Sequence, residues 1–120
     1  MSHELASQLT GKKCVPCEGG VQPLSLEMVQ SYLKAIPQWR LTANGKGIER
    51  SWKAKHFMAA MDFLNRIAAI AEEEDHHPDI HLTGYRQIKI EMTTHSLNGL
   101  SENDFILAAK IDQIPIELKQ

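Results

Sequence analysis

The stretch EEEDHHPD, residues 72–79, divides the chain into a helical part and a part made of strands. Its proline ends any helix that runs into it, because the residue before a proline is pushed out of the α region. Upstream, apolar residues recur three and four positions apart from His56 to about Glu74, which predicts one long helix. Downstream, apolar and polar residues alternate, so strands are expected there.

The downstream strands are predicted to form a hairpin. Residues 80–85 and 87–92 each alternate apolar with polar side chains, which is typical of strands with one buried and one hydrated face. Tyr85 lies near the expected tip. In an antiparallel pair the second strand returns to the start of the first, so Thr94 and His95 should lie beside the end of the long helix.

A second hairpin is expected before the long helix. Ser25 fits the N-cap of a helix that must end near Pro37. The strands Trp39–Ala43 and Ile48–Ala54 then bracket Asn44-Gly45, and Asn-Gly is a strong signal for a hairpin turn.

A last helix is expected after Ser101, with Asp104 close to the capping-box position and Pro115 near its end. The order is therefore helix-strand-strand-helix-strand-strand-helix. It predicts a single α+β domain over residues 25–120, with a four-stranded antiparallel sheet and helices packed on one face.

The long helix carries two adjacent apolar rows, which is more than one sheet face requires. We therefore expect part of this surface to pack against another helix or another subunit. The rows are Phe57, Met61, Leu64, Ala68 and Ala71, and Ala60, Phe63, Ile67 and Ile70.

The composition is that of one ordinary globular domain, with 120 residues, 42% apolar residues and a formal charge of -2. The charges are mixed along the chain, which argues against nucleic acid as the main partner. No apolar run reaches the ~20 residues of a membrane span, and the N-terminus lacks an apolar signal region. We expect a cytoplasmic protein.

Residues 1–24 lack periodicity and are expected to form an N-terminal arm, extended or partly disordered. The arm holds both cysteines, Cys14 and Cys17, in a loop-like context rather than between a strand and a helix. We interpret the pair as a structural feature of the arm. A zinc ion shared with His3 or with another subunit is the alternative, because one such pair supplies only two of four ligands.

The histidines are the candidate chemical groups. His76 and His77 directly follow four acids, and His95 ends the neighbouring strand. Imidazole exchanges protons near neutral pH, so three converging histidines suggest acid and base catalysis on one small substrate. If the long helix runs through its acidic end, Glu72 and His76 lie four residues apart on one helical face.

A metal site is the rival interpretation of the same residues. The possible nitrogen and oxygen ligands for zinc or iron are His76, His77, His81, His95 and Asp79. Neighbouring histidines in an extended turn point apart, however, and the helical HExxH pair is not present in the sequence. We therefore expect no metal.

These residues resemble the sequence pattern of the pterin-4a-carbinolamine dehydratase family. The pattern joins an acid to His-His-Pro, and these to a later aromatic residue, a histidine and an aspartate. The matching residues are Glu72, His76, His77, Pro78, Tyr85, His95 and Asp104. Thr94-His95 and Gly99-Leu100-Ser101 match as well, and the resemblance covers about residues 22–116.

The resemblance implies a reaction, the loss of water from a 4a-hydroxytetrahydropterin to give quinonoid dihydropterin. It assigns the chemistry to His76, His77 and His95, with the pterin as substrate and no cofactor. It implies that Glu72 and Asp104 orient imidazoles. The residues implied to orient or line the substrate are Asp75, Pro78, Tyr85, Thr93, Thr94 and Ser96.

The resemblance also implies a homodimer or homotetramer and a functional link to an aromatic amino acid hydroxylase. One departure is Ile80, where many animal members carry an aromatic residue, and ring stacking is expected to differ there. The alternative function is a non-enzymatic assembly or dimerisation factor on the same fold.

Overall fold

The computed structural model describes residues 8–14 and 22–120. A short helical turn at residues 8–11 precedes the main elements. These are α2 (Leu26–Ala35), β1 (Arg40–Leu41), β2 (Ile48–Lys53), α3 (Phe57–Glu74), β3 (Asp79–Thr83), β4 (Gln87–Met92), the 3-10 helix η1 (His95–Leu97) and α4 (Glu102–Asp112). Their order confirms the predicted α+β class.

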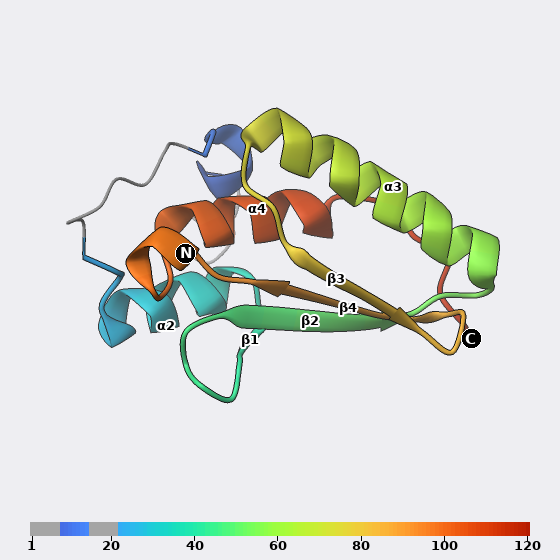
Figure 1. Cartoon of the computed structure of the whole chain (residues 1–120), viewed down its shortest axis with the longest axis horizontal. Coiled ribbons are helices and arrows are strands. Elements are labelled where there is room, and N and C mark those ends of the chain that lie inside the picture. The colour runs from blue at the N-terminus through green and yellow to red at the C-terminus, as the bar shows by residue number, and fades with distance from the viewer. Residues whose placement is uncertain (1–7, 15–21) are drawn as a thin grey trace.

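The four strands form one antiparallel sheet in the order β1-β2-β4-β3. Strand β4 lies between β2 and β3 and joins the two hairpins into a single layer. Figure 1 shows α3 and α4 along one face of this sheet and α2 beside the end where β2 begins. The other face carries polar side chains, with ion pairs such as Arg40 to Glu49 at 2.7 Å.

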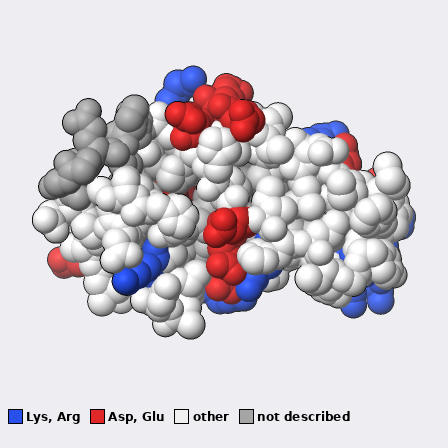
Figure 2. Space-filling model, in the orientation of Figure 1, with Lys and Arg blue, Asp and Glu red and all other residues white. Residues whose placement is uncertain are grey.

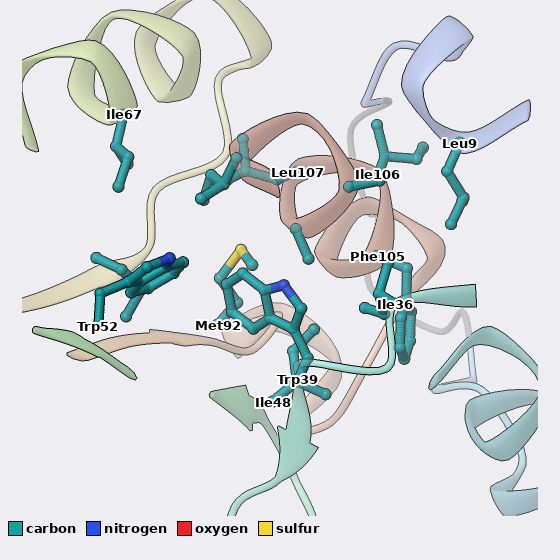
Figure 3. Packing of buried hydrophobic residues seen from close by; sticks show 14 of the residues in the cluster. Leu9, Ile36, Trp39, Ile48, Trp52, Ile67, Met92, Phe105, Ile106 and Leu107 are labelled. Carbon is teal, nitrogen blue, oxygen red and sulfur yellow. The ribbon is translucent and has the colours of Figure 1, made fainter. Parts of the chain in front are cut away.

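Aromatic and branched apolar side chains fill the space between the helices and the sheet (Figure 3). Trp52 of β2 packs edge-on against Phe63 of α3, with ring centroids 5.0 Å apart. Tyr32 of α2 stacks on Phe105 of α4 at 4.9 Å. Complete burial of one such side chain stabilises the fold by about 1.5–3 kcal/mol.

The first hairpin is shorter than the sequence pattern suggests. Strand β1 contains only Arg40 and Leu41, because Thr42 already closes a loop by donating its N–H to the carbonyl oxygen of Gly47. Asn44-Gly45 therefore lies in a six-residue loop, residues 42–47, and not in a two-residue turn. Gly47 is required there, since a Cβ would come within 2.8 Å of the carbonyl oxygen of Met92.

The second hairpin matches the prediction more closely. Its register pairs Asp79 with Glu91 and Thr83 with Gln87. Strand β3 is an edge strand, and Ile80 near its start remains 41% exposed.

The predicted N-terminal arm is described at residues 8–14 and 22–24. Leu9 is fully buried there, so this segment packs on the domain. Cys17 and His3 lie outside the described residues, and so does the suggested zinc site that would use them.

Candidate active site

The site begins where α3 ends. Asp75 adopts the left-handed conformation, with φ of 52°. Its N–H donates hydrogen bonds to the carbonyl oxygens of Ala71 and Glu72. The next N–H, that of His76, also donates to Ala71, at 3.2 Å. A left-handed residue after the last turn reverses the chain direction and satisfies the free carbonyls of the helix. His76 therefore leaves the helix surface.

His76 meets a buried carboxylate. Its Nε2 lies 2.7 Å from Oδ1 of Asp104, in the first turn of α4, and Asp104 is fully buried. Oδ2 of Asp104 accepts hydrogen bonds from Thr94 Oγ1 at 2.8 Å and from the N–H of Ser101 at 3.0 Å. Next to an ionised carboxylate, which can only accept, Nε2 of His76 is the donor and Nδ1 is the acceptor nitrogen of the ring.

His77 has a different partner. Its Nε2 lies 2.9 Å from Oε1 of Glu72, and both side chains are more than half exposed. The prediction that Glu72 shares a face with His76 was wrong. It assumed a helix through residue 76, whereas the turn at Asp75 sends His76 to α4 and brings His77 back over Glu72.

His95 comes to the same end of the sheet through strand register. Asp79 pairs with Glu91, so the residues before β3 lie level with those that follow β4. Thr94 pairs with Gly99 in an isolated bridge, and His95 opens η1 with an exposed side chain. The hydroxyl of Thr94 and the imidazole of His76 both contact the carboxylate of Asp104. Thr94 directly precedes His95, so His95 lies one residue from this contact along the chain.

The remaining predicted site residues divide into two groups. Asp75, Pro78, Thr93 and Ser96 lie in the two segments that meet at this end of the sheet. Tyr85 does not join them: it lies at the tip of the β3–β4 hairpin, with φ of 56° and the guanidinium of Arg86 at 5.0 Å from its ring. The length of the hairpin separates it from the histidines within this chain.

A hollow of about 450 Å³ lies at the histidine end of the sheet. Its lining includes Thr93, two residues before His95, and Asp79, two residues after His77, but none of the three histidines. Acidic side chains gather above the end of α3, as Figure 2 shows. Among the four acids of residues 72–75, Glu72, Glu73 and Asp75 are exposed.

The fourth acid, Glu74, is buried, and the sequence reasoning missed this. Desolvation alone would raise the pKa of Glu74, but hydrogen bonds from Lys110 and from the N–H of Cys14 outweigh it, so the pKa is lowered. The available signal was the run of acids at a helix C-terminus, where the helix dipole disfavours negative charge. A local conflict of this kind often marks a residue with a tertiary partner.

The rival metal site can be compared with the geometry. In residues 8–14 and 22–120, no group of three or more His, Cys, Asp or Glu side chains is arranged to hold a metal ion. His81, one of the suggested ligands, points instead to Glu91 across the strands, at 3.5 Å. Over the same described residues, the helices are too short or too polar to cross a bilayer.

Sequence comparisons connect this geometry with known proteins. A family model described as pterin 4 alpha carbinolamine dehydratase matches residues 22–114. An Arabidopsis thaliana protein named pterin-4-alpha-carbinolamine dehydratase 2, mitochondrial, is 43% identical over 92% of this chain and 61% of its own length. A Halorhodospira halophila protein, provisionally named as the same dehydratase, is 46% identical over 88% of this chain and 96% of its own length.

A solved structure is similar as well. The crystal structure of a transcriptional coactivator/pterin dehydratase from Brucella melitensis superposes with a TM-score of 0.71 and 32% sequence identity. The match covers 76% of this chain and 96% of that one.

Proposed function

The chain belongs to the pterin 4-alpha-carbinolamine dehydratase family of hydro-lyases, and we propose that it dehydrates a 4a-hydroxytetrahydropterin by histidine acid–base catalysis. The observation that carries the mechanism is the hydrogen bond from His76 to the buried carboxylate of Asp104, which also holds Thr94 beside His95. That bond fixes one imidazole nitrogen as a donor and leaves the other for the pterin.

The proposed reaction is an elimination. The bond from C4a to its hydroxyl oxygen breaks, the oxygen takes up a proton and leaves as water, and N5 loses its proton as the C4a–N5 double bond forms. One imidazole must act as acid and another as base, and groups that titrate near neutral pH do both well. The elimination transfers no electrons to or from another molecule, so the proposal requires no cofactor. The pterin itself is the substrate.

The proposal gives each of the three histidines a role. We assign His76 and His95 to the C4a hydroxyl and His77 to the ring edge. Asp104 orients His76 and Glu72 orients His77 by the hydrogen bonds described above. The side chains proposed to line the pterin are those of Asp75, Pro78, Thr93, Thr94 and Ser96.

The direct test supplies chemically generated carbinolamine and follows the loss of its absorbance. We expect the protein to accelerate the loss well beyond the rate in buffer. The absence of acceleration, with a protein shown to be folded by circular dichroism, would reject the function.

The cellular setting is also proposed rather than shown. A homodimer or homotetramer is expected from the apolar surface of α3 that the single chain leaves exposed, such as Phe57 and Met58. A cytoplasmic location and a link to an aromatic amino acid hydroxylase, whose spent pterin the reaction would recycle, remain predictions.

A non-enzymatic role is the second candidate, since the similar Brucella melitensis protein is named a transcriptional coactivator as well as a pterin dehydratase. Stoichiometric capture of a protein partner, together with no pterin binding in calorimetry, would favour it over catalysis.

A further inference from the structure

Glu74, the last residue of α3, is a buried carboxylate whose two oxygens both have partners. Its Oε2 accepts a hydrogen bond from Lys110 Nζ at 2.8 Å, and its Oε1 accepts the backbone N–H of Cys14 at 2.8 Å. Burial of a carboxylate is unfavourable unless such partners are in place. None of these three residues belongs to the motif that marks the family.

The carboxylate of Glu74 belongs to a residue that lies close to His76 along the chain. Only Asp75 separates Glu74 from His76, and Lys110 lies on α4, as Asp104 does. Two hydrogen bonds therefore connect the C-terminal end of α3 and the residues after it with α4. One joins Glu74 and Lys110, and the other joins His76 and Asp104. A shift of the α3 end would move the imidazole of His76 relative to its carboxylate.

The N-terminal segment, residues 8–14, contacts both sides of this junction. Lys12 Nζ lies 3.1 Å from Oε2 of Glu102, and Cys14 Sγ lies 3.6 Å from the carbonyl oxygen of Asn103. Glu102 and Asn103 directly precede Asp104 in the first turn of α4. Leu9 is buried in the core and lies beside Ile106 of α4 (Figure 3), so it holds the segment against that helix.

We infer that Glu74 is a positioning residue for the dehydration, and that residues 9–14 complete the support that holds His76 against Asp104. In this proposal Glu74 acts through His76 and not by contact with the substrate. It fixes the helix end from which the His76-His77 turn departs, and the N–H of Cys14 fixes Glu74. The kinetic part of the inference rests on the proposed function, whereas the effect on His76 does not.

A merely stabilising role for Glu74 makes a different prediction. It would lower the free energy of unfolding and leave the environment of His76 unchanged in molecules that remain folded. A positioning role changes the folded state itself, so the imidazole NMR signals of His76 and the kcat should change together, with little change in KM.

The first experiment compares Glu74→Gln with Glu73→Gln, the same change at the exposed neighbouring position. At a temperature where both variants are folded, we expect kcat of Glu74→Gln to fall about tenfold, because small displacements of a catalytic group are costly. The His76 signals should shift in Glu74→Gln and not in Glu73→Gln. Lys110→Met should behave like Glu74→Gln, and Lys110→Arg, which keeps a charged donor, should recover most of the activity.

The second experiment isolates the N-terminal segment. Cys14→Pro removes the backbone donor to Glu74, whereas Cys14→Ala removes only the thiol. We expect Cys14→Pro to shift the His76 signals and lower kcat several-fold, and Cys14→Ala to change the His76 signals much less.

The outcomes separate the two proposals. If wild-type protein does not accelerate dehydration, the proposed function fails, and the NMR comparison still decides whether Glu74 positions His76. Unchanged His76 signals in folded Glu74→Gln, Lys110→Met and Cys14→Pro would overturn the inference. If Glu74→Gln does not fold, the other two variants decide it.

Discussion

At the scale of single residues, Asp104 serves the site and the fold with its two carboxylate oxygens. Oδ1 accepts from His76, and Oδ2 accepts from Thr94 and from the N–H of Ser101 at the start of α4. The same group therefore orients an imidazole and satisfies a free helix donor. Asp104 is completely buried, so these three hydrogen bonds do not compete with water.

Replacement of His76 or His95 by alanine should remove an acid or base from the proposed reaction. We expect kcat to fall on the order of 10²-fold in each variant. The carbinolamine assay measures this, with circular dichroism as the control for folding. Retention of more than half of the wild-type kcat in either variant would exclude that histidine as an acid–base group.

Asp104→Asn tests the orienting bond. The amide has one oxygen and one NH2 group, so whichever way it turns it offers a donor to a group that already donates, either His76 Nε2–H or the N–H of Ser101. We expect kcat to fall by about 10²-fold, through the wrong tautomer of His76 or a displaced ring. ¹⁵N NMR of the imidazole should show the altered tautomer, and an unchanged tautomer with unchanged kcat would contradict the assignment.

At the scale of elements, the ends of α4 fix its position on the sheet. Near its start, Asp104 contacts the segment after β4, and at its end Asp112 accepts from Trp39 Nε1 at 2.8 Å and from Arg50 of β2. Desolvation raises the pKa of Asp112, although Trp39 and Arg50 act in the opposite direction. These contacts hold α4 so that Asp104 faces His76.

Two substitutions at Asp112 separate hydrogen bonding from charge. Asp112→Ala leaves the Trp39 N–H without its acceptor and should lower the free energy of unfolding by about 1–3 kcal/mol. Asp112→Asn keeps an oxygen acceptor and should cost much less. Urea unfolding measures both, and equal losses for the two variants would show that the charge matters more than the bond.

At the scale of the whole molecule, acid stability should depend on the junction at Glu74. The pKa of this group lies below its ordinary value of 4.5 in the folded protein. Its ionised form therefore contributes stability that is complete above pH 4.5 and is lost as the pH falls through the lower, folded pKa.

We expect Glu74→Gln to be less stable than the wild type at pH 7, with the difference shrinking as the pH falls below about 4.5 and through the lower pKa of the folded protein. Urea unfolding at several pH values gives the difference directly. A difference independent of pH would mean that the carboxylate charge contributes nothing.

The sequence alone determined the features that depend on neighbours along the chain. Ser25 accepts the N–H of Met28 as the predicted N-cap, α3 ends before Pro78, and the alternation of residues 87–92 gives the β4 strand. The fold class followed from the order of these elements. The spacing of His76, His77 and His95 also indicated the family, because the pattern is local in its parts.

Only the tertiary structure decided which carboxylate each histidine meets. The spacing placed Glu72 beside His76, but one left-handed residue, Asp75, gave Glu72 to His77 and His76 to Asp104, 28 positions away in the sequence. It likewise buried Glu74 against Lys110 and the N–H of Cys14. Helix and strand periodicity follow from backbone geometry at short range. The partners of the histidines and of Glu74 depend instead on how separate elements pack against one another.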